Sequence, residues 1–360
     1  MVGIARYTYE LYTRACDLDP ELSVEIRVFG AEPPPLAIMP RHPSIAVRRF
    51  PDPSRVMRPG RAWGWHRVEA ARRQVIGRLW GTGPAVWHST FYTLPSAGWD
   101  GPVVTTCHDL IYHRLPHLHA GDRHDQARRQ MVEAVERADL VLCVSEATRD
   151  DVVALTGVPA SRCRVTPLAH SDVFRPLAAS ERGEPNGGRP YVLYVGSRYQ
   201  HKGFATLLSA YAWWGHRGEV DLVVVGPPLA ETERAAVEQL GVAGRVRTVD
   251  GVDDEALCQL YNGAVALVHT SLIEGFGIPL LEAMACQCPI VATAIPTTKE
   301  VAGDVPIYAE PACPETLRDG LDRALDEDHA ERVARGTQRA GSFSWVRTAA
   351  ETLAAYRSIQ

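Results

Sequence analysis

The sequence predicts an α/β protein of two doubly wound domains, each built on a parallel sheet, with a cleft between them. Three observations lead to this prediction. Short Val- and Leu-rich runs recur along the chain, and their continuous apolar character is typical of parallel strands buried on both faces. Helical patterns separate these runs, which is the rhythm of βαβ units. A polar stretch, ERGEPNGGRP at 181–190, divides this rhythm into two halves.

The expected elements follow in chain order. The first half offers a helix over 126–138 and the strands PAVWHS, PVVTTC, ADLVLCVS and CRVTPL. The second half offers helices over 204–213 and 253–261 and the strands YVLYVGS, VDLVVVG, GRVRTVD, VALVHTS and PIVATA. We therefore expect an N-terminal domain over 1–180, a linker over 181–190, a C-terminal domain over 191–340 and a final helix over 341–360. Ligands bind beyond the carboxyl ends of such strands, so residues there matter most.

Composition narrows the class of protein. A chain of 360 residues with 46% hydrophobic residues and a net charge of −5 suits a two-domain globular protein. No apolar run reaches the roughly 18 residues of a membrane span, and no signal peptide opens the chain. The eight cysteines form no CxxC pair, as expected for free thiols in a reducing cytoplasm. The acidic balance argues against a nucleic-acid partner.

The stretch EGFGIPLLEAMA, residues 274–285, has the composition of an anion site at the start of a helix. Pro279 suits the first helical turn, so Glu274 falls in the preceding loop and Glu282 inside the helix. Gly275 and Gly277 keep the loop backbone open. Free amides at the positive end of the helix dipole suit a phosphate, and the carboxylates are left to hold hydroxyl groups.

Two strand ends carry further candidates. Arg198 and Lys202 follow YVLYVG and could clamp a diphosphate, although the two cations taken alone favour a solvated loop. His108-Asp109 follows VVTTC, and a histidine at that position is either structural or faces the cleft. No GxGxxG follows the first strand of either half, and neither GxxxxGK[ST] nor GxSxG occurs in the chain. Phosphate binding is therefore expected at the loop before residue 279.

These motifs, in this order, resemble those of the retaining glycosyltransferases of family 4, which have the two-domain GT-B fold. EGFGIPLLEAMA resembles the family's Glu-x7-Glu signature, and YVLYVGSRYQHKGF its diphosphate-clamping strand and loop. CHDLIYH, LCVSEATRDDV and SFSWVRTAAETLAAY resemble its His-Asp turn, closing strand and C-terminal helix. The chain departs from the pattern at MVGIARYTYEL, which begins inside the family's glycine loop, so an opening strand is absent and Val2 and Ala5 replace glycines.

The resemblance implies roles for particular residues. His108 and Glu274 would contact the donor sugar and serve as the catalytic residues, and Glu282 would bind the ribose. The other donor-binding positions would be Gly3, Arg198, Lys202, Gly251, Val252, Gly275, Phe276, Gly277 and Ile278. Fixed cations and helix amides stabilise the charge of a departing nucleoside diphosphate, so we expect no metal and no cofactor besides the nucleotide-sugar donor. Two Asp-x-Asp spacings, at 17–19 and 326–328, are poorly placed for a metal.

The implied reaction transfers a hexose, mannose or a related sugar, from a nucleotide diphosphate to an acceptor hydroxyl with retention. The acceptor would be a glycan, a lipid-linked sugar or a small natural product. Two alternatives stay open: a nucleotide-sugar epimerase on the same fold, and an inactive protein that only binds the donor. Residues 41–80 hold ten arginines and three tryptophans against two acids, which suggests either a peripheral contact with the inner membrane face or a solvated segment.

Overall fold

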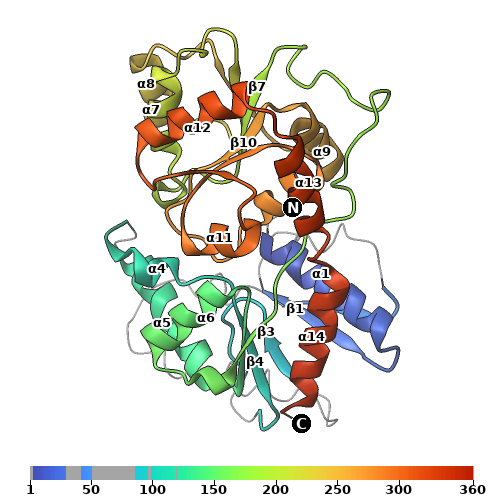
Figure 1. The fold of residues 1–360 in the computed structure, drawn as a ribbon. Coiled ribbons are helices and arrows are strands. Elements are labelled where there is room, and N and C mark those ends of the chain that lie inside the picture. Colours follow the sequence, from blue (N-terminus) through green and yellow to red (C-terminus); the bar gives the residue numbers. More distant parts are fainter. Residues whose placement is uncertain (1–2, 30–41, 51–85, 96–98, 119–120, 360) are drawn as a thin grey trace.

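The computed structural model describes residues 3–29, 42–50, 86–95, 99–118 and 121–359. The predicted architecture of two parallel-sheet domains is confirmed, because every strand pair in the described residues is parallel. Figure 1 shows the two domains one above the other, with the described elements of residues 3–165 in the lower one.

The C-terminal domain is built on a six-stranded sheet in the order β12-β11-β10-β7-β8-β9. Central β7 pairs with β8 in the register Tyr191 to Asp221. Its strands are β7 (Tyr191–Val195), β8 (Asp221–Val225), β9 (Val246–Val249), β10 (Ala266–His269), β11 (Ile290–Thr293) and β12 (Ile307–Ala309). Its helices are α7 (Phe204–Trp213), α8 (Glu231–Gln239), α9 (Asp254–Gly263), α10 (Ile278–Ala285), α11 (Pro296–Ala302), α12 (Pro314–Asp326) and α13 (Ala330–Ala340).

The N-terminal domain contains a four-stranded sheet and a separate strand pair. The sheet runs β3 (Trp87–Ser89), β4 (Val103–Cys107), β5 (Leu140–Cys143) and β6 (Cys163–Val165), and the pair is β1 (Val24–Phe29) with β2 (Ile45–Phe50). Its helices are α1 (Gly3–Leu18), α4 (Ile111–Arg114), α5 (Asp122–Arg137) and α6 (Glu146–Thr156). The opening residues, expected as part of a loop, are instead the first turn of α1 from Gly3 onward.

The last helix, α14 (Trp345–Arg357), returns to the N-terminal domain and lies beside α1 (Figure 1). Its Tyr356 hydroxyl lies 2.6 Å from Nδ1 of His88 on β3, and the Thr348 hydroxyl donates to the carbonyl of Pro167. The ring of Trp345 lies 6.2 Å from that of Tyr7 on α1. The chain therefore crosses between the domains twice, and the second crossing is anchored by buried contacts.

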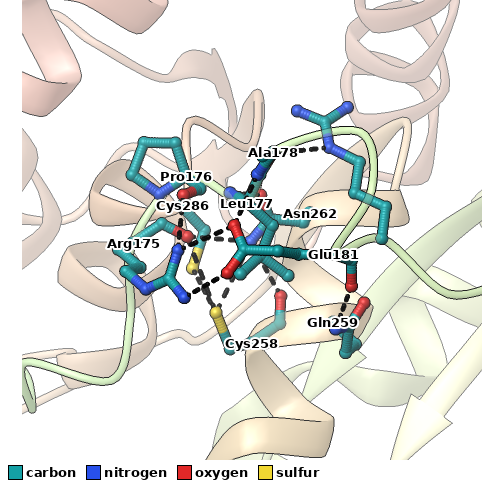
Figure 2. A network of polar contacts seen from close by, with 10 residues as sticks. Arg175, Pro176, Leu177, Ala178, Glu181, Cys258, Gln259, Asn262 and Cys286 are labelled. Atoms are coloured by element: carbon teal, nitrogen blue, oxygen red, sulfur yellow. Dashed lines mark hydrogen bonds and ion pairs between the residues drawn. The ribbon is translucent and has the colours of Figure 1, made fainter.

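The first crossing is fixed to the C-terminal domain before the predicted linker begins. Figure 2 shows the segment from Arg175 to Glu181 along α9. The Asn262 side chain accepts from the Leu177 amide at 2.8 Å and donates to the Arg175 carbonyl at 3.0 Å. Gln259 donates to the Glu181 carbonyl at 2.8 Å. These amide side chains satisfy the backbone of an irregular segment, so residues 175–181 are held to the C-terminal domain.

The membrane hypothesis rested on residues 41–80, of which 41 and 51–80 lie outside the described residues. Within the parts of the chain that the structure describes, no helix is long and apolar enough to cross a bilayer.

Candidate functional site

A cavity of about 310 Å³ lies between the two domains, where the carboxyl ends of β4, β7 and β10 meet. Its N-terminal side includes Ile4, His108 and Asp109, and its C-terminal side includes Lys202, His269, Glu274 and residues 275–279. The cavity therefore brings together most of the residues singled out in the sequence, in the position that doubly wound folds use for ligands.

Helix α10 begins as the sequence predicted. Pro279 is its second residue, Gly277 precedes it with φ +95°, and Glu274 lies in the loop before it. In the described residues, the N–H groups of Gly275, Phe276, Gly277 and Ile278 donate to no protein acceptor. We call residues 274–278 the donor loop. Its free amides and the adjacent helix dipole form an arrangement suited to anions.

The donor loop is pressed against the N-terminal domain at Gly275. A Cβ added there would lie 1.6 Å from the carbonyl oxygen of His108, so only glycine permits this approach. The Gly275 carbonyl accepts hydrogen bonds from the hydroxyls of Ser145 at 2.7 Å and Thr148 at 3.1 Å, both at the start of α6. Because the peptide unit is planar and trans, fixing this carbonyl also fixes the Phe276 N–H in the opposite direction.

Glu274 is a carboxyl group of the cavity that has two hydrogen-bond partners. Its Oε1 accepts from Lys202 Nζ and from the Ser271 hydroxyl, each at 2.6 Å, while Oε2 has no partner in the described residues. Burial acts to raise the pKa of this carboxyl, but Lys202, His269 and the hydrogen bonds outweigh it and lower the pKa to about 2. The carboxylate is therefore ionised at neutral pH, with one oxygen left to accept hydroxyl groups.

Lys202 is held at the cavity by its backbone. It ends a short 3-10 turn, Gln200–Lys202, and its carbonyl accepts from the Thr270 hydroxyl at 2.8 Å. The next residue, Gly203, has φ +67°, and a Cβ there would lie 2.1 Å from the Thr270 carbonyl oxygen. An ammonium has three donors and Glu274 uses one of them, so Lys202 can bind an anion while it stays paired.

His108 is buried and neutral at physiological pH, since burial lowers its pKa to about 4. Its Nε2 lies 3.1 Å from the Thr90 carbonyl, which can only accept, so Nε2 carries the proton and Nδ1 is left as an acceptor. Tyr7 packs its ring edge-to-face against the imidazole at a centroid distance of 4.9 Å. The ring orientation is thus set from two sides.

His269 belongs to the site but was missed in the sequence. It ends β10, and its Nε2 lies 3.5 Å from Oε1 of Glu274 without hydrogen-bonding geometry. Burial lowers its pKa to about 4, against the attraction of Glu274. Its position at the carboxyl end of a central strand was the signal that could have identified it.

The structure does not bring Arg198 to the cavity beside Lys202. Its Nε donates to Glu233 at 2.9 Å and its Nη2 to the Pro228 carbonyl at 2.9 Å, and the side chain is only 7% exposed. Ser197 lines the cavity at this point of the chain instead. Of the two cations expected to clamp a diphosphate, Lys202 therefore lines the cavity in this structure and Arg198 does not.

The remaining candidates lie around the cavity rather than on its wall. Glu282 is buried within α10, where its two oxygens accept from Arg6 and Tyr261. Val252 packs against the core before α9, next to Gly251 at φ +67°. Gly3 begins α1, one residue before Ile4 in the cavity wall. Arg6 was not singled out from the sequence, because its partners are far away in the chain.

Within the described ranges, no three His, Cys, Asp or Glu side chains gather as a metal site would require. The titratable groups of the cavity are His108, Asp109, Tyr194, His269 and Glu274, together with Lys202. The pKa of Asp109 is raised by burial, although Lys202 and an amide hydrogen bond oppose this.

Comparisons with known proteins identify the family of this chain. Residues 178–340 match the family model described as glycosyl transferases group 1, and residues 1–169 match that of glycosyltransferase family 4. The O-antigen chain mannosyltransferase B of Escherichia coli is 31% identical over 71% of this chain and 70% of its own. The MMP alpha-(1->4)-mannosyltransferase of Mycolicibacterium hassiacum is 27% identical over 93% of this chain and 90% of its own.

Solved structures show the same fold at lower identity. The crystal structure of Anabaena HepE in complex with UDP-glucose superposes with a TM-score of 0.76 at 18% identity, covering 98% of this chain and 96% of that one. WaaG, a glycosyltransferase involved in lipopolysaccharide biosynthesis, superposes with a TM-score of 0.74, covering 99% of this chain and 96% of its own.

Proposed function

Because this chain belongs to glycosyltransferase family 4 and has the GT-B fold, we propose that it transfers a hexose, mannose or a closely related sugar, from a nucleotide diphosphate to an acceptor hydroxyl with retention and without a metal. The observation that carries the proposal is the cavity that joins Lys202, the free amides of the donor loop, Glu274 and His108. Two relatives that are mannosyltransferases support the choice of sugar.

The diphosphate would lie against Lys202 and the amides of Phe276, Gly277 and Ile278. Negative charge grows on the diphosphate as the glycosidic bond breaks, so a fixed ammonium and the positive end of α10 stabilise the transition state more than the ground state. These groups are already oriented before the donor arrives, which is the condition for electrostatic catalysis. Arg198 stays a proposed contributor to the clamp that requires a test by mutation.

The sugar would be held by acceptors on both sides of the cavity. Oε2 of Glu274 and Nδ1 of His108 each have an unused lone pair, and sugar hydroxyls are donors of matching chemistry. We assign no covalent nucleophile. Instead, we expect the acceptor hydroxyl to attack from the face that the diphosphate leaves, with a donor phosphate oxygen taking its proton. Attack on the same face preserves the anomeric configuration.

The test is incubation with GDP-mannose, UDP-glucose and related donors, together with candidate acceptors, in the presence of EDTA. We expect release of nucleoside diphosphate only with acceptor and cognate donor, and an NMR spectrum of the first-formed product with a retained anomeric centre. Isomerised donor would indicate an epimerase, and binding without turnover an inactive protein. Activity abolished by EDTA and restored by manganese would contradict metal independence, and an inverted product would contradict retention.

A further inference from the structure

Arg6 lies in α1 of the N-terminal domain, but its charged partners belong to the C-terminal domain. Its Nη1 donates to Oε1 of Glu282 at 3.0 Å, and its Nη2 pairs with Asp254 at the start of α9. The ring of Phe174 lies 5.8 Å from the guanidinium carbon. The side chains of Arg6 and Glu282 are only 8% and 5% exposed, so this ion pair between domains is shielded from solvent.

Glu282 is oriented from two directions. Oε1 accepts from Arg6, and Oε2 accepts from the Tyr261 hydroxyl at 2.9 Å. A carboxylate oxygen has two acceptor positions, so each oxygen keeps one for a further donor. The two orienting groups come from different domains, since Tyr261 is on α9 and Arg6 is on α1. The carboxylate is thus complete only when the domains are together.

We propose that Arg6 is a positioning residue for Glu282, supplying from the N-terminal domain the positive charge that this buried carboxylate needs to recognise the nucleoside part of the donor. The inference rests on the proposed function, because Glu282 is the carboxylate assigned to the ribose. Its physical reason is that an ion buried without a partner takes up or loses a proton instead of remaining charged.

The surroundings of Glu282 make its ionised state depend on Arg6. Burial raises the pKa of Glu282 above its ordinary value, although Arg6 and Tyr261 oppose the rise. The titratable groups acting on the Glu282–Tyr261 pair are Arg6 from α1, Asp254 from α9, and Cys286 and Cys288 after α10, with Cys258 of α9 in contact with Cys286. Of these, only Arg6 carries positive charge. Without Arg6, we expect the pKa of Glu282 to rise further, and a carboxyl that takes up a proton loses acceptor capacity toward ribose hydroxyls.

The experiment measures UDP and GDP affinity by calorimetry between pH 6 and pH 9 for Arg6→Met, with Arg14→Met as the matched control. Arg14 lies on the same helix and is 35% exposed, and in the described residues its acidic partners Glu10, Asp17 and Asp172 all belong to the N-terminal half of the chain. We expect Arg6→Met to weaken binding at least tenfold at pH 6, with the deficit shrinking as pH rises and Glu282 ionises. Arg14→Met should bind as the wild type does, and Arg6→Lys should retain most of the affinity.

A double variant separates positioning from a general structural role. Glu282→Gln should weaken binding without a pH trend, and adding Arg6→Met to it should cost little more. A deficit in Arg6→Met that is the same at every pH, or additive effects in the double variant, would overturn the inference. Should Arg6→Met fail to fold, Arg6→Lys tests the inference instead, and its smaller loss of nucleotide affinity should likewise shrink as the pH rises. A wild type that binds neither nucleotide, and neither ADP nor dTDP, would refute the proposed function, and the inference with it.

Discussion

Replacing Lys202 by methionine removes the positive charge beside Glu274 while keeping a side chain of similar length. Glu274 would then be a carboxylate 10% exposed, with its Oε1 bonded only to Ser271 and near His269. We expect a loss of stability, because breaking a buried ion pair by removing one partner leaves the other charge uncompensated. We also expect weaker binding of nucleoside diphosphate, since Lys202 is proposed to contact it.

The size of the expected loss of stability follows from the pKa of Glu274. The pKa of Glu274 lies at about 2 in the folded protein instead of 4.5. One pKa unit corresponds to about 1.4 kcal/mol, so the ionised carboxylate contributes about 3 kcal/mol to folding at neutral pH. Because the folded pKa is the lower one, this contribution is complete above pH 4.5 and is lost as the pH falls toward 2. Most of it should disappear in Lys202→Met.

The assay is urea unfolding at pH 7 of Lys202→Met, Glu274→Gln and the double variant. We expect Lys202→Met to lose about 3 kcal/mol and the double variant to lose less than the sum of the single changes, because Glu274→Gln leaves no charge to compensate. Lys299→Met is the control, since Lys299 is exposed on α11. Additive effects, or a loss in Lys202→Met no larger than in Lys299→Met, would refute this account of the pair.

Three further predictions test the contacts around the cavity. Gly275→Ala should lower transfer activity at least tenfold, because overpacking costs about 1–3 kcal/mol. Gly244→Ala, whose Cβ meets nothing within 4 Å, should leave transfer activity unchanged, and equal activities of the two variants would contradict the prediction. Glu300→Ala should raise the donor KM severalfold. The Glu300 carboxylate accepts from the first amides of α6 at 2.7 and 3.0 Å, and losing such a cap costs about 1 kcal/mol. An unchanged KM would argue against this role of Glu300. Arg198→Ala should weaken diphosphate binding about tenfold if Arg198 joins the clamp, and unchanged affinity in calorimetry with a lowered Tm would restrict it to its contact with Glu233.

The sequence could predict features that depend on local pattern. Continuous apolar runs indicated parallel strands, and Pro279 after two glycines indicated where α10 begins and left Glu274 in the loop. The His108-Asp109 pair was expected at a strand end, with a structural role or a place facing the cleft left open, and it lines the cavity. Each of these depends on neighbours within a few positions, where backbone propensities decide the structure.

The sequence could not predict where long side chains find their partners. Arg198 and Glu233 are separated by 35 positions, and Arg6 and Glu282 by 276, so no local pattern connects them. Arg198 was expected at the cavity because it lies four residues from Lys202, but a nearby carboxylate and the Pro228 carbonyl hold its guanidinium elsewhere. A guanidinium on a flexible stem takes the best set of acceptors within reach, which only the folded packing determines.

Three contacts between the domains converge on the groups proposed to bind the donor. Gly275 of the donor loop lies against the His108 backbone, Glu300 of α11 accepts from the amides of α6, and Arg6 of α1 orients Glu282. Each is a polar or close backbone contact, and the domains also share an apolar cluster that includes Tyr7 and Phe276. Separating the domains would therefore release the Gly275 carbonyl, the cap of α6 and the charge partner of Glu282 together. The proposed donor site would be complete only with the domains together, so variants of Glu300 and Arg6 should affect donor binding although neither residue lines the cavity.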